Sequence, residues 1–365
     1  MAGICHIFTM ESHHRIPTLD GWRAVAIAAV ILSHGFLLPG ATTRPVRALG
    51  YVAGHLGGTG VALFFAISGY LITTLLLEER ERWGRISLRG FYIRRAFRIL
   101  PPAYLYLILL AGSLQRGELF SAAFFYSNYW PERSWYTQHF WSLSMEEHFY
   151  LFWPALLGWL GVRRGVIAAS FLVGATILWR PWSLVHVHLP YPALQRTDMR
   201  LDAFLFAGTL AILLHGPYRV PILEVLTAAW FRFLSALILL STWIWTVAGS
   251  APATGILVES LLLPCLLVSM IHWPGSLGFR LLELFPLCWM GRISYGLYLW
   301  QQFFFVHGSV VTPDEAAKTF FPRVALTFAV ATASYYLLER PLLTYGRSVA
   351  RRFLPEVEPS SIMEQ

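Results

Sequence analysis

Two ionisable side chains lie within one long apolar segment near the start of the chain. Arg23 and His34 are eleven residues apart in residues 18–38, TLDGWRAVAIAAVILSHGFLL. At 3.6 residues per turn this spacing puts both side chains on one helix face, about 16 Å apart along the axis. If Arg23 lies at one membrane interface, His34 lies near the middle of a hydrocarbon core about 30 Å thick. Ionisable groups at that depth are costly and are candidates for function.

A neutral histidine is well suited to take a proton from a hydroxyl group near pH 7, which makes His34 a candidate general base. The alternative interpretation is a histidine that hydrogen-bonds a neighbouring helix and serves packing alone. The position of His34 by itself leaves both interpretations open.

Two adjacent carboxylates interrupt a second apolar segment, FWSLSMEEHFYLFWP. Glu146 and Glu147 have to be paired or protonated if they are buried there. They either orient a histidine, ligate a cation, or form an ion pair with an arginine such as Arg23. No set of residues has the spacing of a metal site, so the sequence predicts no bound metal.

Seven arginines fall within residues 78–98, EERERWGRISLRGFYIRRAFR. Arg95 and Arg98 are spaced i, i+3 and therefore share a helix face. Planar guanidinium groups bind phosphate groups in a bidentate manner, so this pair is a candidate phosphate site. The alternative is an ordinary basic anchor at the cytoplasmic end of a membrane helix.

Two further segments hold polar residues that suit a substrate site. Ser68 and Tyr70 follow a glycine-rich run, and they either face a cavity or belong to a closely packed helix. Asp198 and Asp202 share a helix face at i, i+4, with Arg200 on another face. These three charged residues form either a polar substrate site or a solvated helix start.

Two motifs near the C-terminal end complete the set of candidates. Gln301 lies in GRISYGLYLWQQFF, whose aromatic and amide side chains suit either a sugar or an interfacial belt. The later run Glu339-Arg340-Pro341 is typical of a helix stop with a charge pair.

The composition indicates the elements that position these residues. Of 365 residues, 56% are hydrophobic and 13% are charged, whereas soluble proteins carry about 25% charged residues. The sequence therefore predicts an all-α, polytopic integral membrane protein. The formal charge of +8 comes from arginines that cluster in loops, which favours membrane orientation over nucleic-acid binding.

About ten transmembrane helices fit the distribution of apolar residues. They are placed at 18–38, 58–77, 97–113, 140–160, 165–180, 199–215, 229–248, 253–272, 285–306 and 321–338. The loop arginines predict that both the N- and the C-terminus are cytoplasmic. The outer-side segment 114–139 is either re-entrant, over about 118–130, or interfacial. The predicted parts are a cytoplasmic segment 1–14, a membrane domain 15–350 and a disordered cytoplasmic tail 351–365.

Several of these segments resemble, in the same order, the motifs of acyltransferase family 3. LDGWRAVAIAAVILSH resembles its opening helix, and FFAISGYLI resembles its SG-F/Y-LI signature. RRAFRILPPAY resembles its R-x-x-R element, and WSLSMEEHFYLFWP resembles its WSL-x-x-EE-x-FY-x-x-WP motif, which adds Tyr150 to the site. The resemblance covers about residues 15–350, and the joint order of the motifs carries it. The chain departs from the family at Gln301, where members often have a histidine.

The resemblance implies a bacterial inner-membrane enzyme that moves acyl groups, usually acetyl, from acyl-CoA onto sugars. Acceptors in the family include O-antigens of lipopolysaccharide, exopolysaccharides, peptidoglycan and smaller glycosides. We therefore expect acetyl-CoA or another acyl-CoA as co-substrate, a carbohydrate or glycolipid acceptor, and no permanently bound cofactor. The expected catalytic residues are His34, Glu146, Glu147 and Arg23; the expected donor-binding residues are Arg95 and Arg98; the expected substrate-binding residues are Ser68, Tyr70, Tyr150, Asp198, Arg200, Asp202 and Gln301.

In the expected mechanism His34 acts as general base on the acceptor hydroxyl, with Glu146 or Glu147 setting its tautomer or stabilising the imidazolium. Arg23 stabilises developing negative charge or holds a carboxylate. An acyl-histidine intermediate is the second possibility. The alternative functions are a proton-coupled transporter or flippase for a polyol or glycolipid, and a membrane scaffold in a polysaccharide-synthesis complex.

Overall fold

The computed structural model describes residues 16–35, 44–187, 189, 192–247, 252–305 and 313–353. Every regular element within these ranges is helical and none is a strand, which confirms the predicted all-α class for the described part of the chain. The predicted N-terminal segment 1–14, and the predicted tail beyond Phe353, lie outside the described residues.

The chain divides into two compact units. The first consists of Met1–Ser68 with Pro217–Ala329, and the second consists of Gly69–Gly216 with Val330–Gln365. Helices α2 (Arg44–Trp83) and α13 (Pro313–Ser334) each contribute to both units. The remaining helices of the first unit are α1 (Pro17–Gly35), α7 (Arg219–Thr227), α8 (Ala229–Val247), α9 (Pro252–Ile271), α10 (Leu277–Leu282), α11 (Phe285–Arg292) and α12 (Ser294–Phe304). Those of the second are α3 (Leu88–Leu110), α4 (Arg116–Ala123), α5 (Phe140–His186), α6 (Thr197–Leu214) and α14 (Arg340–Arg351), with the short turns η1 (Ser127–Tyr129), η2 (Trp135–Thr137), η3 (Ala193–Gln195) and η4 (Tyr335–Glu339).

In the first unit, α1 packs against α9, α10, α11 and α12. The contacts are close because glycines lie at them: a side chain at Gly21 would collide with the backbone of Leu282, and one at Gly291 would collide with the carbonyl of Asp20. Small residues of this kind let helices approach within a membrane. The packing fixes the helix that carries Arg23 and His34.

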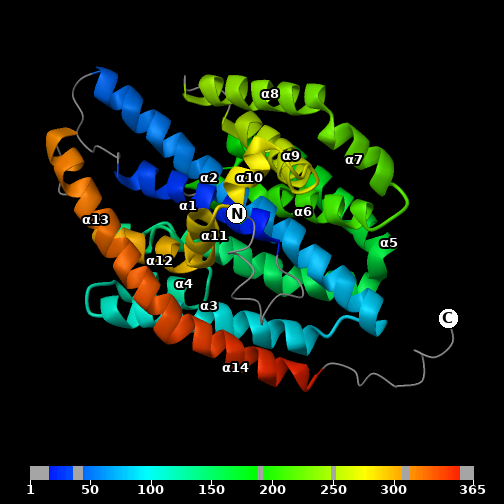
Figure 1. Cartoon of the computed structure of the whole chain (residues 1–365). Helices are drawn as coiled ribbons and strands as arrows, with labels where there is room; N and C mark the ends of the chain where they lie inside the picture. Colours follow the sequence, from blue (N-terminus) through cyan, green and yellow to red (C-terminus); the bar gives the residue numbers. More distant parts are fainter. Residues whose placement is uncertain are drawn as a thin grey trace. The chain divides into compact units, whose positions relative to one another are not determined.

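In the second unit, α5 packs against α6, and α3 packs against α14 (Figure 1, cyan and red). Helix α5 bends at Gly161, whose φ of 74° lies in the left-handed region that favours glycine. The bend falls in the predicted gap between spans 140–160 and 165–180 and gives α5 two arms.

Each of the ten predicted spans coincides with a described helix or helix pair, although the boundaries differ. The predicted span 285–306 is divided at Ile293 into α11 and α12. The predicted helix stop at Glu339-Arg340-Pro341 is wrong, because the chain passes through the π-helical turn η4 and continues as α14. Proline lacks an N–H and crowds the preceding turn, and here it lies in the first turn of the new helix, where both features are tolerated.

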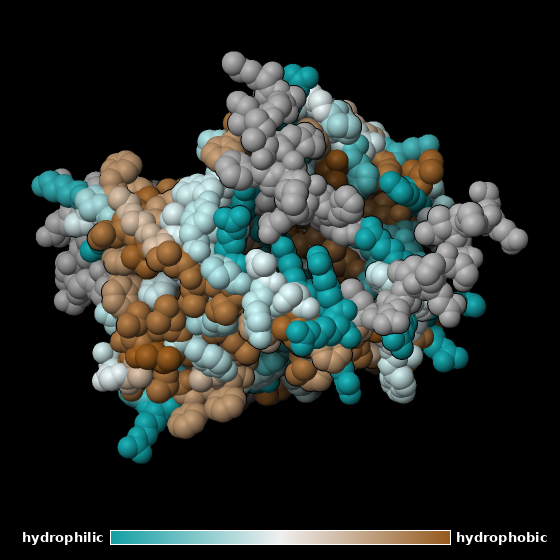
Figure 2. All heavy atoms as spheres, turned by 60° about the horizontal axis from the view of Figure 1, so that its bottom comes forward, coloured by the Kyte–Doolittle hydropathy of each residue, from teal (hydrophilic) through white to brown (hydrophobic). Residues whose placement is uncertain are grey.

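Among the residues that the structure describes, four stretches are long and apolar enough to cross a membrane, and the bent pair α7–α8 makes a fifth if it counts as one span. This supports a membrane protein, while the count of ten spans stays a prediction. Large hydrophobic side chains are exposed along α5, among them Phe152, Trp159, Phe171, Leu178 and Val185. Figure 2 shows broad hydrophobic areas, in brown, on the face that it displays. Such areas are typical of surfaces that contact lipid.

Candidate active site

His34 lies at the end of α1, where its ring meets Gln301 of α12. Nδ1 of His34 is 2.6 Å from Oε1 of Gln301, a side chain that is fully buried. A carboxamide oxygen only accepts hydrogen bonds, so with the Gln301 amide in this orientation a neutral His34 has its proton on Nδ1 and its lone pair on Nε2. The arrangement therefore prepares Nε2 to act as a base.

This contact gives Nδ1 of His34 a partner within the first unit that the sequence had not suggested, the amide of Gln301. The expected roles of Glu146 and Glu147, setting the tautomer or stabilising the imidazolium, stay predictions. Gln301 had been considered as a sugar ligand, and its position beside His34 was missed because the two residues are 267 positions apart.

Arg23 lies on the same helix as His34, three turns earlier. Its Nη1 is 3.1 Å from Oδ1 of Asp20, and the side chain of Asp20 is buried. Of the two expected roles, the structure shows Arg23 holding a carboxylate, and that carboxylate belongs to its own helix. The aspartate was missed, although its place three residues before Arg23 is a recognisable signal for an i, i+3 pair.

Arg95 and the two adjacent glutamates meet in the second unit, through Tyr150. The guanidinium group of Arg95 lies 4.8 Å from the ring centroid of Tyr150. The hydroxyl of Tyr150 donates to Oε2 of Glu146 at 2.8 Å. Glu147 interacts electrostatically with both Glu146 and Arg95. We call these four residues the Arg95 cluster.

Arg98 also has an acidic neighbour. It interacts electrostatically with Glu339 in the η4 turn, a residue that is only 3% exposed and accepts a hydrogen bond from Ser334 Oγ at 3.0 Å. Both members of the pair therefore face carboxylates in the second unit. Turns of the π type often occur at functional positions, and this one places Glu339 where it interacts with Arg98.

The charged residues at the start of α6 contact side chains of α5 in the second unit. Asp202 forms a buried ion pair with Arg180 of α5, with Nη2 and Oδ1 2.5 Å apart. Asp198 accepts from Trp179 Nε1 at 2.8 Å, and the guanidinium group of Arg200 lies 5.6 Å from the ring centroid of Trp141.

For Asp202 the structure contradicts the solvated alternative, since the carboxylate is buried and paired with Arg180. Its place in a substrate site stays a prediction. The shared face of the two aspartates is confirmed, because both contact neighbouring residues of the second arm of α5. Arg180 was not singled out from the sequence. It could have been found there, because Arg180 is the one charged residue in the predicted span 165–180.

Ser68 and Tyr70 flank a close contact between helices. Gly69 lies between them, and a side chain at Gly69 would collide with the carbonyl oxygen of Phe204 in α6. Tyr70 is buried and Ser68 is partly buried. The structure therefore supports the close-packing interpretation of this glycine-rich helix. Their role in substrate binding stays a prediction.

No group of three or more histidine, cysteine, aspartate or glutamate side chains among the described residues could hold a metal ion. The first unit offers a histidine held by an amide, and the second unit offers guanidinium groups beside carboxyl groups. A histidine base suits proton transfer from a hydroxyl group.

Comparison with known proteins relates the chain to enzymes that transfer acyl groups. A family model described as an acyltransferase domain matches residues 16–340. The chain is 26% identical to the peptidoglycan O-acetyltransferase OatA of Listeria monocytogenes, over 93% of this chain and 57% of the relative. It is 30% identical to YrhL of Bacillus subtilis, a putative peptidoglycan O-acetyltransferase, over 95% of this chain and 58% of the relative. It is 28% identical to the O-acetyltransferase OatA of Staphylococcus aureus, over 95% of this chain and 60% of the relative.

The chain thus spans less than two thirds of the length of these curated relatives. No solved protein structure gives a significant match to it.

Proposed function

The chain belongs to acyltransferase family 3, and on this premise we propose that it is a membrane O-acetyltransferase. The reaction moves an acetyl group from acetyl-CoA to a hydroxyl group of a glycan acceptor. The observation that carries the proposal is the contact between His34 Nδ1 and Gln301 Oε1, which leaves Nε2 as the basic nitrogen. The names of the relatives support acetyl as the group and a glycan as the acceptor.

In this mechanism Nε2 of His34 takes the proton of the acceptor hydroxyl as its oxygen attacks the thioester carbonyl carbon. The new C–O ester bond forms, the C–S bond breaks, and the imidazolium returns the proton to the leaving thiolate. Gln301 keeps the ring in one tautomer and orientation throughout, as the partner of a catalytic histidine does in hydrolases. Direct transfer needs no covalent histidine intermediate.

Arg23 has a positioning role in this proposal. It lies on the same continuous helix about 16 Å from His34, so its guanidinium group does not reach the reacting carbonyl. Its bond to Asp20 holds the start of α1, where Gly291 of α11 contacts the Asp20 carbonyl. The pair supports the helix that carries the base.

We propose that Arg95 and Arg98 bind phosphate groups of the donor. Guanidinium groups suit phosphates, and both side chains belong to the arginine-rich segment 78–98, which the predicted topology puts on the cytoplasmic side. The carboxyl groups of Glu147 and Glu339 lie beside the same arginines, so they compete with the phosphates for these guanidinium groups. Donor affinity then depends on how the carboxyl groups and the phosphates share the arginines.

We further propose ten membrane spans with cytoplasmic termini, in the inner membrane of a bacterium. The support is the agreement between the predicted spans and the helices, together with the exposed hydrophobic side chains of α5. Two of the relatives are named as peptidoglycan O-acetyltransferases, one of them putatively, so a peptidoglycan-like glycan is the first acceptor to test.

The test is transfer by the purified protein in nanodiscs. Acetyl-CoA labelled in the acetyl group is supplied with peptidoglycan fragments or other glycans, and label in the acceptor is measured with free CoA. The proposal predicts an alkali-labile acetyl ester on one acceptor class and one CoA per ester. Proton-coupled movement of a polyol or glycolipid in liposomes, without any consumption of acetyl-CoA, would favour the transporter instead.

A further inference from the structure

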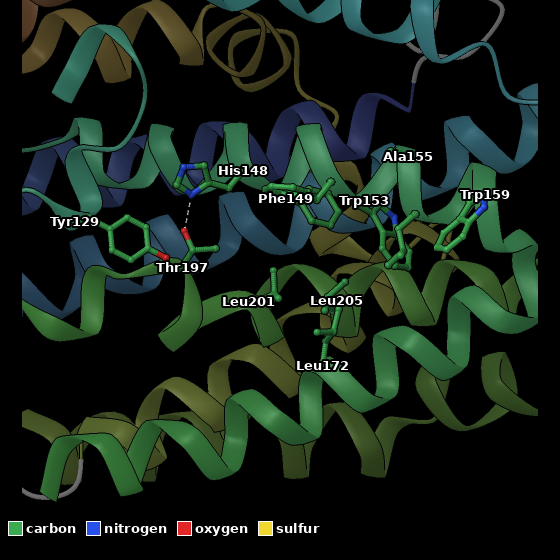
Figure 3. A pocket seen from close by; sticks show the side chains of 12 residues that line it. Tyr129, His148, Phe149, Trp153, Ala155, Trp159, Leu172, Thr197, Leu201 and Leu205 are labelled. Carbon is green, nitrogen blue, oxygen red and sulfur yellow. Dashed lines mark hydrogen bonds between the residues drawn. The ribbon is translucent and has the colours of Figure 1, made fainter. Parts of the chain in front are cut away.

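A groove runs between the first arm of α5 and α6 in the second unit. It has a volume of about 830 Å³, within the range of pockets that bind small molecules. Figure 3 shows its lining side chains, which come mainly from these two helices. They are Tyr129, His148, Phe149, Phe152, Trp153, Ala155, Leu156, Trp159, Leu172, Thr197, Leu201 and Leu205. None of these residues belongs to the Arg95 cluster or to the His34 contact.

The walls of the groove are hydrophobic and adjoin the lipid. Phe152 and Trp159 are 67% and 83% exposed and lie on a stretch long and apolar enough to cross a membrane. From His148 to Trp159 the helix rises about 16 Å, which is half of a hydrocarbon core. If this stretch of α5 spans the membrane, hydrocarbon chains lie beside the groove and run along it.

Only one end of the groove is polar. There, His148 Nδ1 lies 2.7 Å from Thr197 Oγ1 (Figure 3, dashed line), and the hydroxyl of Tyr129 donates to Asp198 Oδ1 at 3.3 Å. Burial and the neighbouring carboxylate of Asp198 raise the pKa of Tyr129, so its hydroxyl remains protonated. The guanidinium group of Arg196 lies 4.7 Å from the centroid of the Tyr129 ring.

This distribution fits an amphiphile with a hydrocarbon chain and a hydroxylated head. Arg196 and Asp198 are paired at 3.0 Å, so their charges offset each other and favour a neutral head over a phosphate. Aromatic planes with neighbouring hydroxyl and carboxylate oxygens suit the apolar faces and hydroxyl groups of a sugar.

We propose that the α5–α6 groove binds the hydrocarbon chain of a glycolipid acceptor, with its sugar at the Tyr129 end. The proposal rests on the proposed function and specifies its substrate class, namely a glycan acceptor that is carried on a lipid. The hydrophobic walls between Phe149 and Trp159 bind the chain, and the polar residues at the other end bind the head.

The test is photo-labelling of the full chain in nanodiscs by a twelve-carbon maltoside with a diazirine at the end of its chain. The probe is used below its micelle concentration, and labelled peptides are mapped by mass spectrometry. The proposal predicts labelling concentrated in 148–159 and 201–205. Unlabelled dodecyl maltoside is expected to compete at least fivefold better than phosphatidylglycerol. Labelling spread evenly over other lipid-facing helices such as α8, or equal competition by phosphatidylglycerol, would overturn the proposal.

A groove-filling variant gives an independent result. Leu201→Trp is expected to reduce labelling of 148–159 at least fivefold, whereas Leu237→Trp, at an exposed position of α8, leaves it unchanged. If Leu201→Trp does not fold, the competition between dodecyl maltoside and phosphatidylglycerol on the unaltered protein still tests the proposal. Labelling does not depend on catalysis, so a His34→Gln protein should label normally. Failure of the groove and failure of the acetyltransferase proposal can thus be told apart.

Discussion

A histidine acts as a base through one ring nitrogen most effectively when the other nitrogen is held. Gln301 holds Nδ1 of His34 at 2.6 Å, and its side chain is fully buried. The family position often carries a second histidine, which would titrate, whereas an amide does not. The amide thus holds the ring without adding a competing base.

Two substitutions of Gln301 separate its effect on the orientation of the His34 ring from the effect of its side-chain volume. Gln301→Met keeps the volume and removes the acceptor, so kcat for acetyl transfer should fall about 10- to 100-fold with little change in the KM for acetyl-CoA. Gln301→Glu keeps an acceptor oxygen and should retain more activity than the methionine variant. Steady-state kinetics on protein with an unchanged melting temperature provides the measurement. Full kcat in Gln301→Met would show that Nδ1 needs no partner.

Glu147→Gln tests whether the carboxyl group beside Arg95 limits donor binding. The substitution removes a carboxyl group that competes with phosphate for Arg95, so acetyl-CoA should bind about threefold to tenfold more tightly, equivalent to roughly 0.7–1.4 kcal/mol. Arg95→Gln should weaken binding. Calorimetric titration with CoA measures both, and Glu224→Gln at an exposed position of α7 is the control. Weaker CoA binding in Glu147→Gln would mean that this carboxylate supports the donor site.

At the scale of elements, the sequence predicted where helices lie better than what they contact. Each of the ten predicted apolar runs falls on a described helix or helix pair, and the arginine and glutamate motifs identified several of the charged positions. The partners were missed where they come from distant segments, as with Gln301 and Arg180. The continuation of the chain past Glu339 was missed because a π-helical turn absorbs the proline, and no local pattern signals such a turn.

The contact between α2 and α6 gives a prediction about two glycines of one helix. Gly69→Ala should destabilise the protein by about 1–3 kcal/mol or more, because the added carbon would overlap the carbonyl oxygen of Phe204. Gly58→Ala is the control, since an added carbon there meets no atom within 4 Å and alanine favours a helix by about 1 kcal/mol. Thermal unfolding in detergent should give a lower midpoint for the first and an equal or higher midpoint for the second. The reverse order would show that α2 and α6 can separate without cost.

At the scale of the whole molecule, membrane orientation decides which substrates reach which residues. The arginine-rich segment 78–98 and the arginines that follow the α5 bend were the signals for the cytoplasmic side. Hydrophobic composition predicted a membrane protein from the sequence alone. The division into two compact units was not predicted, because it depends on contacts between segments far apart in the chain.

Cysteine labelling in intact cells tests this orientation. In a cysteine-free background, Arg82→Cys and Arg164→Cys should react with a membrane-impermeant maleimide only after lysis, whereas Glu132→Cys should react before it. All three positions are exposed in the structure, so access depends on the side of the membrane. Labelling of Arg164→Cys in intact cells would reverse the assignment of the α5 bend to the cytoplasm.

The most direct measurement is acceptor-dependent release of CoA from acetyl-CoA by the wild type and by His34→Gln. His272→Gln, a substitution of another histidine in the first unit, is the matched control. The account predicts that His34→Gln folds normally and loses release by about 100-fold or more, while His272→Gln retains it. A folded His34→Gln protein that releases CoA and acetylates the acceptor at the wild-type rate would contradict the assignment of His34 as the base.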